Sequence, residues 1–120
     1  MFKPVEPALA PAAVGPYSQG IALDNLVFSS GQLPMNPETK TMPADIAEQA
    51  RQSLSNVKAV GSGMDKVIKV NIFLTDMADF ARVNEVYAQF FKAPFPARSC
   101  VAVAALPLGA GLEIEAVAVK

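Results

Sequence analysis

The spacing of apolar residues changes from a helical to a strand period between Gly61 and residue 66, and this change constrains the fold more than any other feature of the chain. From Asp45 to Gly61 apolar residues recur every three or four positions, as they do on one face of a helix. Asp45 and Glu48 predict a capping box at the helix start, and Gly61 predicts its end. The residues of the apolar face are Ile46, Ala50, Leu54, Val57 and Val60.

Residues 66–75 alternate with a period of two, which predicts a strand directly after this helix. A second helix is expected to begin near Asp76 or Asp79 and to end before Pro94. The predicted buried face of the strand consists of Ile68, Val70, Ile72 and Leu74. The predicted stripe of the second helix consists of Phe80, Val83, Tyr87 and Phe90.

Four further strands are predicted on either side of this central unit. Asp24-Asn25 suits a tight hairpin turn between the first two strands, and a loop with two glycines joins the last two. Residues 1–16 contain four prolines and predict an extended arm. The order β-β-α-β-α-β-β predicts an α+β fold, a mixed β-sheet with two helices packed on one face. The four strands are 19–23, 26–30, 98–105 and 112–119.

The length and charge of the chain exclude several classes of protein. A chain of 120 residues suits one core, so residues 1–120 are expected to form a single domain. The 10 basic and 11 acidic residues form no run of one sign, which argues against a nucleic acid partner. No apolar stretch predicts a membrane span or a secretory signal. The single cysteine suits a reducing compartment, so the cytoplasm is expected, with the mitochondrial matrix as the alternative.

Self-association is expected, because two helices can cover only one face of the sheet. The opposite face carries Val and Phe among polar residues and needs a partner. The chain is also 52% hydrophobic and only 18% charged, which is apolar for its size.

Arg98 is the only charged residue in the segment 94–100. Its guanidinium offers a planar fork of donors that can bind a carboxylate or a phosphate at two points. The alternative is an ordinary structural ion pair, and the local sequence does not decide between the two. Cys100 would lie on the same strand face as Arg98. It is either a small buried hydrophobe or a nucleophile, and with no histidine in the chain no imidazole could activate it.

Several polar residues have both a structural and a functional interpretation. Glu113 and Glu115 would share one face of the last strand, either facing solvent or with one of them orienting a water molecule. Asn84 either meets solvent or makes a specific hydrogen bond. The Ser30-Gly31 pair forms either a plain turn or a place where backbone N–H groups approach a ligand. Tyr17 either packs the arm or closes a pocket.

The chain lacks the residue sets of several known catalytic sites. It has no Ser-His-Asp triad, no phosphate-binding glycine loop and no paired cysteines. With no histidine and one cysteine, a transition-metal site is not expected. Composition and spacing alone therefore predict an anion-binding α+β domain.

Four motifs taken together resemble the reactive intermediate deaminase family, RidA subgroup. They are GPYSQG at 15–20, SSGQLP at 29–34, VNIFL at 70–74 and PARSCV at 96–101. The resemblance extends through 103–107 and 113–116, so it covers nearly the whole chain from about residue 10. It implies a chorismate-mutase-like fold assembled as a homotrimer, with ligand clefts between the subunits.

The resemblance also implies an activity and a role for each matched residue. The activity is the hydrolysis of 2-iminopropanoate and 2-iminobutanoate, released by pyridoxal-phosphate enzymes, to 2-oxo acids and ammonia, with no metal or organic cofactor. Arg98 would bind the substrate carboxylate and Glu113 would position the attacking water. The residues that would line or close the cleft are Tyr17, Ser30, Gly31, Asn84 and Cys100. Two other functions stay open, a non-catalytic ligand-binding or chaperone-like trimer and an endoribonuclease that inhibits translation.

Overall fold

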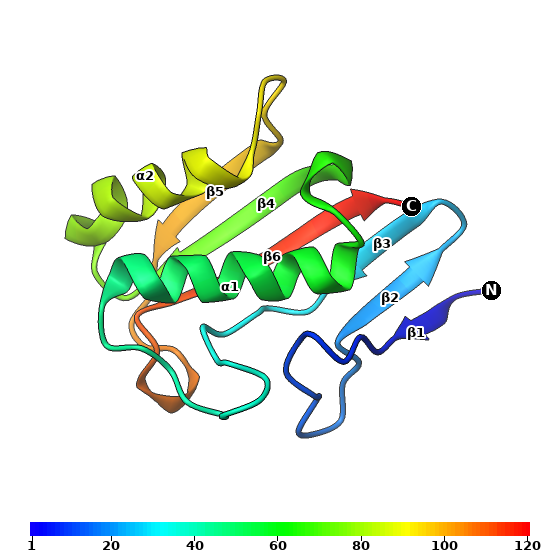
Figure 1. Cartoon of the computed structure of the whole chain (residues 1–120), viewed down its shortest axis with the longest axis horizontal. Helices are drawn as coiled ribbons and strands as arrows, with labels where there is room; N and C mark the ends of the chain where they lie inside the picture. The colour runs from blue at the N-terminus through cyan, green and yellow to red at the C-terminus, as the bar shows by residue number, and fades with distance from the viewer.

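A mixed sheet of six strands forms one layer of the computed structural model, which describes residues 1–120, and both helices lie across one of its faces (Figure 1). The strand order is β1-β2-β3-β6-β4-β5, and only the pairing of β4 with β5 is parallel. The predicted α+β class is therefore confirmed. The elements are β1 (Lys3–Val5), β2 (Gly20–Leu23), β3 (Leu26–Ser29), α1 (Ile46–Gly61), β4 (Val67–Leu74), α2 (Phe80–Phe90), β5 (Ala97–Ala102) and β6 (Leu112–Val119).

Helix α1 begins as the sequence predicts but ends differently. The carboxylate of Asp45 accepts a hydrogen bond from the backbone N–H of Glu48 at 3.1 Å, which caps the first turn. The left-handed residue after the helix is Ser62, at φ 69°, and not Gly61. Gly61 is instead the last helical residue and is buried, because the helix lies close to Ala118 of the sheet there.

Helix α2 follows a short 3-10 turn, Met77–Asp79. The side chain of Asp76 accepts a hydrogen bond from the N–H of Ala78 at 2.9 Å and so caps this turn. The chain turns helical in two steps, which places the start of α2 one residue after Asp79.

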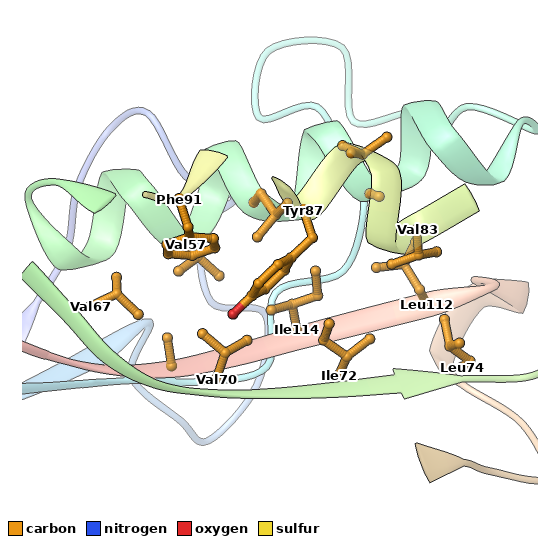
Figure 2. Packing of buried hydrophobic residues seen from close by; sticks show 14 of the residues in the cluster. Val57, Val67, Val70, Ile72, Leu74, Val83, Tyr87, Phe91, Leu112 and Ile114 are labelled. Carbon is orange, nitrogen blue, oxygen red and sulfur yellow. The ribbon is translucent and has the colours of Figure 1, made fainter. Parts of the chain in front are cut away.

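The main core lies between the two helices and the sheet. Figure 2 shows Val57 of α1 and Tyr87 of α2 facing Val70 and Ile114 of the strands below them. All four are buried, and burial of each such side chain contributes about 1.5–3 kcal/mol to folding. The labelled residues in Figure 2 are Val57, Val67, Val70, Ile72, Leu74, Val83, Tyr87, Phe91, Leu112 and Ile114.

The predicted burial of Ile68 is wrong. A shift of register between Val67 and Lys69 interrupts the pairing of β4 with β6. Because of this bulge Val67 turns inward at 7% exposure, whereas Ile68 is 47% exposed. Val70, Ile72 and Leu74 lie beyond the bulge and are buried as predicted.

The N-terminal arm is more ordered than the sequence predicts. Its first part forms β1, which pairs with β2 and adds a sixth strand. The buried amide of Gln19 donates to the carbonyl oxygens of Pro7, Ala10 and Pro11 at 3.3, 3.2 and 2.6 Å. Since Gln19 stands at the entrance to β2, these bonds fasten the arm to the edge of the sheet.

The face of the sheet opposite the helices is uncovered within one chain. Along β6 the residues under the helices are buried, while Glu113 and Glu115 alternate with them on the open face. Phe28 and Val101 stand on this open face at 40% and 47% exposure. Neither helix is long and apolar enough to span a membrane.

Candidate functional site

Strand pairing divides the predicted site residues between the two faces of the sheet. Arg98 and Cys100 pair with Val70 and Ile72, which are buried beneath the helices. Glu113 pairs with Phe73 and therefore points to the open face. Within one chain the sheet thus separates Arg98 from Glu113.

Arg98 lies on the edge strand β5, beneath helix α2. One of its terminal nitrogens donates a hydrogen bond to the Oδ1 atom of Asn84 at 2.6 Å. Its guanidinium carbon is 4.7 Å from the centre of the Tyr87 ring and 5.5 Å from that of Phe80. These contacts orient the guanidinium without neutralising its charge.

No carboxylate of the chain pairs with Arg98. The two ion pairs of the structure are Arg51 with Glu48 and Arg82 with Asp45, both on the helices or their ends. The alternative of an ordinary structural ion pair within the chain is therefore wrong. The guanidinium is partly exposed and contacts an amide and two aromatic rings, so its charge is available to an external anion.

Asn84 makes a specific hydrogen bond, which decides between its two interpretations. It stands on an exposed position of α2, four residues after Phe80 and three before Tyr87, so all three share one helix face. Its Oδ1 atom accepts from Arg98, and an amide placed this way fixes the direction of the guanidinium.

Cys100 is half-buried against the main core. Burial raises the pKa of its thiol, and the charge of Arg98 only partly opposes this. The thiol is therefore protonated at neutral pH and is a poor nucleophile. It lies two residues after Arg98 on β5, on the same face of the strand.

We expect Cys100→Ser to keep kcat/KM for an imino acid within about fivefold of wild type, because a protonated thiol contributes packing and not attack. Steady-state kinetics of the variant and resistance of the wild type to iodoacetamide would check this. Complete loss of activity in a folded Cys100→Ser protein would identify the thiol as catalytic.

A second group of predicted residues lines a cavity of about 590 Å³ on the other side of the molecule. Tyr17, Ser30, Gly31 and Glu113 all lie on its wall. The rest of the lining is largely apolar and comes from the arm and from the loops after β3 and before β6. These other residues are Pro11, Ala12, Val14, Gln19, Gln32, Leu33, Met35, Pro107 and Leu108.

Gly31 allows Glu113 to approach the backbone. A Cβ atom added at Gly31 would overlap the Oε1 atom of Glu113, so no other residue fits with the carboxylate in this place. Ser30 fixes the same segment, since its hydroxyl donates to the carbonyl of Ser18 at 2.5 Å. The segment is therefore tied to Ser18 and leaves room beside its backbone for the Glu113 carboxylate.

We expect Gly31→Ala to lower kcat/KM by about 100-fold, because its methyl group would displace the carboxylate of Glu113 by about 1 Å. Gly61→Ala is the matched control, since a Cβ there meets only Ala118 at an ordinary 3.5 Å. Kinetics and melting temperatures of both variants provide the comparison. Equal activity in the two would mean that Glu113 tolerates displacement.

The structure distinguishes Glu113 from Glu115. Glu115 accepts a hydrogen bond from the side-chain amide of Asn71 at 3.1 Å, whereas Glu113 has no hydrogen-bond donor in the chain. Burial raises the pKa of Glu113, and the negative charge of Glu115 adds to this effect. Glu113 is therefore the carboxylate suited to exchange a proton with a ligand.

Two contacts of Arg98 were not predicted from the sequence. The sequence predicts Phe80 and Tyr87 only as members of the apolar stripe of the second helix, whereas in the structure their rings lie over the guanidinium. Their spacing with Asn84 could have indicated a shared face, but the partner strand could not be known. No group of three or more His, Cys, Asp or Glu side chains is placed to hold a metal ion.

Comparison with known proteins places the chain in one family. The family model described as Endoribonuclease L-PSP matches residues 7–120. The 2-iminobutanoate/2-iminopropanoate deaminase of Escherichia coli strain K12 is 50% identical over 127 aligned positions, which cover 100% of this chain and 99% of that protein.

Solved structures share the whole fold. The YjgF gene product of Escherichia coli superposes with a TM-score of 0.95 at 49% identity, covering 98% of each chain. The crystal structure of Escherichia coli TdcF with bound serine gives a TM-score of 0.95 at 50% identity, again over 98% of each chain. The sheet order and the two helices described above are therefore those of this structural group.

Proposed function

The chain belongs to the reactive intermediate deaminase family, and from this we propose that it hydrolyses 2-imino acids, 2-iminopropanoate and 2-iminobutanoate among them, to 2-oxo acids and ammonia. One relative carries this activity in its name, and another has been crystallised with serine, a small molecule with an α-carboxylate. The proposed substrate is such a small carboxylate.

Arg98 is the observation that carries the proposal. It has a permanent charge, no acidic partner in the chain, and an orientation fixed by Asn84 and two rings. A guanidinium in this state can bind the substrate carboxylate at two points. The imine carbon of the substrate would then lie at a fixed distance from the Arg98 guanidinium.

Glu113 would assist the attack of water. Its carboxylate accepts a proton as the water oxygen bonds to the imine carbon, and the C=N electron pair moves to nitrogen. Glu113 returns this proton to the nitrogen, which gives the neutral tetrahedral intermediate. The proton of its hydroxyl group then moves through the Glu113 carboxylate to the amino group, the C–N bond breaks, the oxygen becomes the carbonyl of the 2-oxo acid and ammonia leaves. One water is consumed for each 2-oxo acid and ammonia formed. An imine is already electrophilic, so orientation supplies much of the rate enhancement.

The two halves of this site would meet between copies of the chain. Arg98 and Glu113 lie on opposite faces of one sheet, so a single chain cannot present both to one small substrate. A chorismate-mutase-like homotrimer would cover the open sheet face and bring β5 of one copy to the cavity of the next. The homotrimer is the assembly we propose, and the cytoplasm is the compartment.

A coupled assay tests the function. Serine or threonine dehydratase supplies the imino acid, and the chain at equal concentration should accelerate release of pyruvate or 2-oxobutanoate over the spontaneous rate. No acceleration by a folded, assembled protein would leave the non-catalytic binding or chaperone-like function as the better account.

RNA cleavage is the second candidate, because the matching family model carries the description Endoribonuclease L-PSP. The chain has no histidine and a net charge of -1, so neither a common ribonuclease base nor a basic surface supports it. Cleavage of a labelled RNA that disappears in Arg98→Ala would favour it over imine hydrolysis.

A further inference from the structure

We propose that Tyr87 is a positioning residue for Arg98, and that the face of its ring, with Phe80, sets the plane in which the guanidinium meets a carboxylate. The proposal rests on the function proposed above for Arg98. It assigns a role to two aromatic side chains of α2, of which Tyr87 belongs to the main core and Phe80 packs against it.

The geometry places an aromatic and amide surface over the guanidinium. Phe80, Asn84 and Tyr87 succeed one another along one face of α2, and each contacts Arg98. The rings lie 5.5 and 4.7 Å from the guanidinium carbon, within the range of cation–π attraction. Asn84 occupies a donor at 2.6 Å, which leaves the donors of the other nitrogens for an anion.

Without these contacts Arg98 would be free to rotate. It stands on an edge strand, pairs with no carboxylate and is partly exposed. A flexible arginine loses side-chain entropy when it binds an anion, and a side chain already held in place loses less. The rings therefore favour binding although they never touch the substrate.

The hydroxyl group of Tyr87 takes no part in this role. The residue is only 5% exposed, and its oxygen has no hydrogen-bond partner. Figure 2 shows the ring directed from α2 toward the sheet, with the oxygen at its far end above Val70. Burial raises the pKa of this phenol, so it stays neutral. The ring of Tyr87, and not its polar group, is what acts on Arg98.

Two pairs of variants separate positioning from core packing. Tyr87→Phe keeps the ring and should leave KM within about twofold, whereas Tyr87→Leu should raise it about 5- to 30-fold with a smaller change in kcat. Phe80→Leu should also raise KM. Phe90→Leu is its matched control, since Phe90 is another partly buried phenylalanine of α2 packed on the same core but without contact to Arg98.

Binding and spectroscopy give readouts that do not need turnover. The dissociation constant for 2-oxobutanoate, measured by calorimetry, should rise with KM in Tyr87→Leu and Phe80→Leu. The Nε–H proton resonance of Arg98 should be shifted upfield by the rings in the wild type and in Tyr87→Phe, and should lose this shift in Tyr87→Leu. If Tyr87→Leu does not fold, the dissociation constants of Phe80→Leu and Phe90→Leu test the positioning role on their own.

The outcomes distinguish this proposal from the proposed function. A wild type that binds 2-oxobutanoate through Arg98 but hydrolyses no imine would overturn the deaminase function. The binding measurements on the Tyr87 and Phe80 variants would still test the positioning role. Equal dissociation constants in Phe80→Leu and Phe90→Leu would overturn the positioning role even in an active enzyme. A wild type that binds no carboxylate would overturn both.

Discussion

Arg98→Ala is expected to lower kcat/KM for 2-iminobutanoate by at least about 1,000-fold, equivalent to about 4 kcal/mol of lost stabilisation. The side chain makes its hydrogen bond to Asn84 and its ring contacts at the surface of the core, so its removal leaves the fold intact. The loss should therefore appear in the coupled dehydratase assay, with little change in melting temperature or in assembly.

Arg98→Lys tests whether the fork of donors matters as well as the charge. Lysine keeps the positive charge but cannot bind a carboxylate at two points or stack on the rings in the same way. We expect it to recover part of the activity and to remain about 10- to 100-fold below wild type. Full activity in Arg98→Ala would show that the substrate carboxylate is bound elsewhere.

Glu113→Gln should lower kcat by about 100- to 10,000-fold with a smaller change in KM. The amide keeps the size of the side chain and its place beside Gly31 but cannot accept a proton. Single-turnover kinetics on an imine generated in the assay would separate this step from binding. The Glu115→Gln variant is the matched control, because that carboxylate is already occupied by the amide of Asn71.

The pH dependence of these variants follows from the raised pKa of Glu113. Glu113 must be ionised to accept a proton, so kcat/KM in the wild type should fall as the pH drops through this pKa, at a higher pH than for an ordinary glutamate. This acid limb should disappear in Glu113→Gln. An unchanged limb in the variant would assign it to another group.

Stability should change in the opposite direction to activity. Because the pKa of Glu113 is higher in the folded than in the unfolded chain, the folded state binds the proton more tightly. Its stabilising contribution is present below the unfolded pKa and is lost as the pH rises through the folded pKa. At pH 7 Glu113→Gln should therefore melt at a higher temperature than wild type, whereas near pH 4 the two should converge.

Periodicity was sufficient to predict most of the fold, because each element carries its own pattern of burial. The alternation along β6 correctly put Glu113 opposite the core, and the start of α1 at Asp45 is a local hydrogen bond. The prediction that Ile68 is buried failed for a physical reason. A bulge depends on the partner strand, and the alternation of apolar and polar residues along one strand does not reveal it. The pairing of β1 was missed for the same reason.

The site could be predicted only in its components. A lone arginine in an apolar segment indicates an anion, but its lack of an acidic partner depends on where 11 acidic residues lie after folding. The difference between Glu113 and Glu115 likewise depends on Asn71, which lies 44 positions before Glu115 in the sequence. The separation of Arg98 from Glu113 by the sheet required the register of three strands.

A mixture of two inactive variants tests the shared site most directly. Arg98→Ala and Glu113→Gln proteins are denatured together, refolded in equal amounts and assayed for imine hydrolysis. If Arg98 of one copy and Glu113 of another act on one substrate, random mixed trimers should recover about one quarter of wild-type activity, since half of each contribution is intact. Recovery of no activity from well-folded mixed trimers would contradict the account.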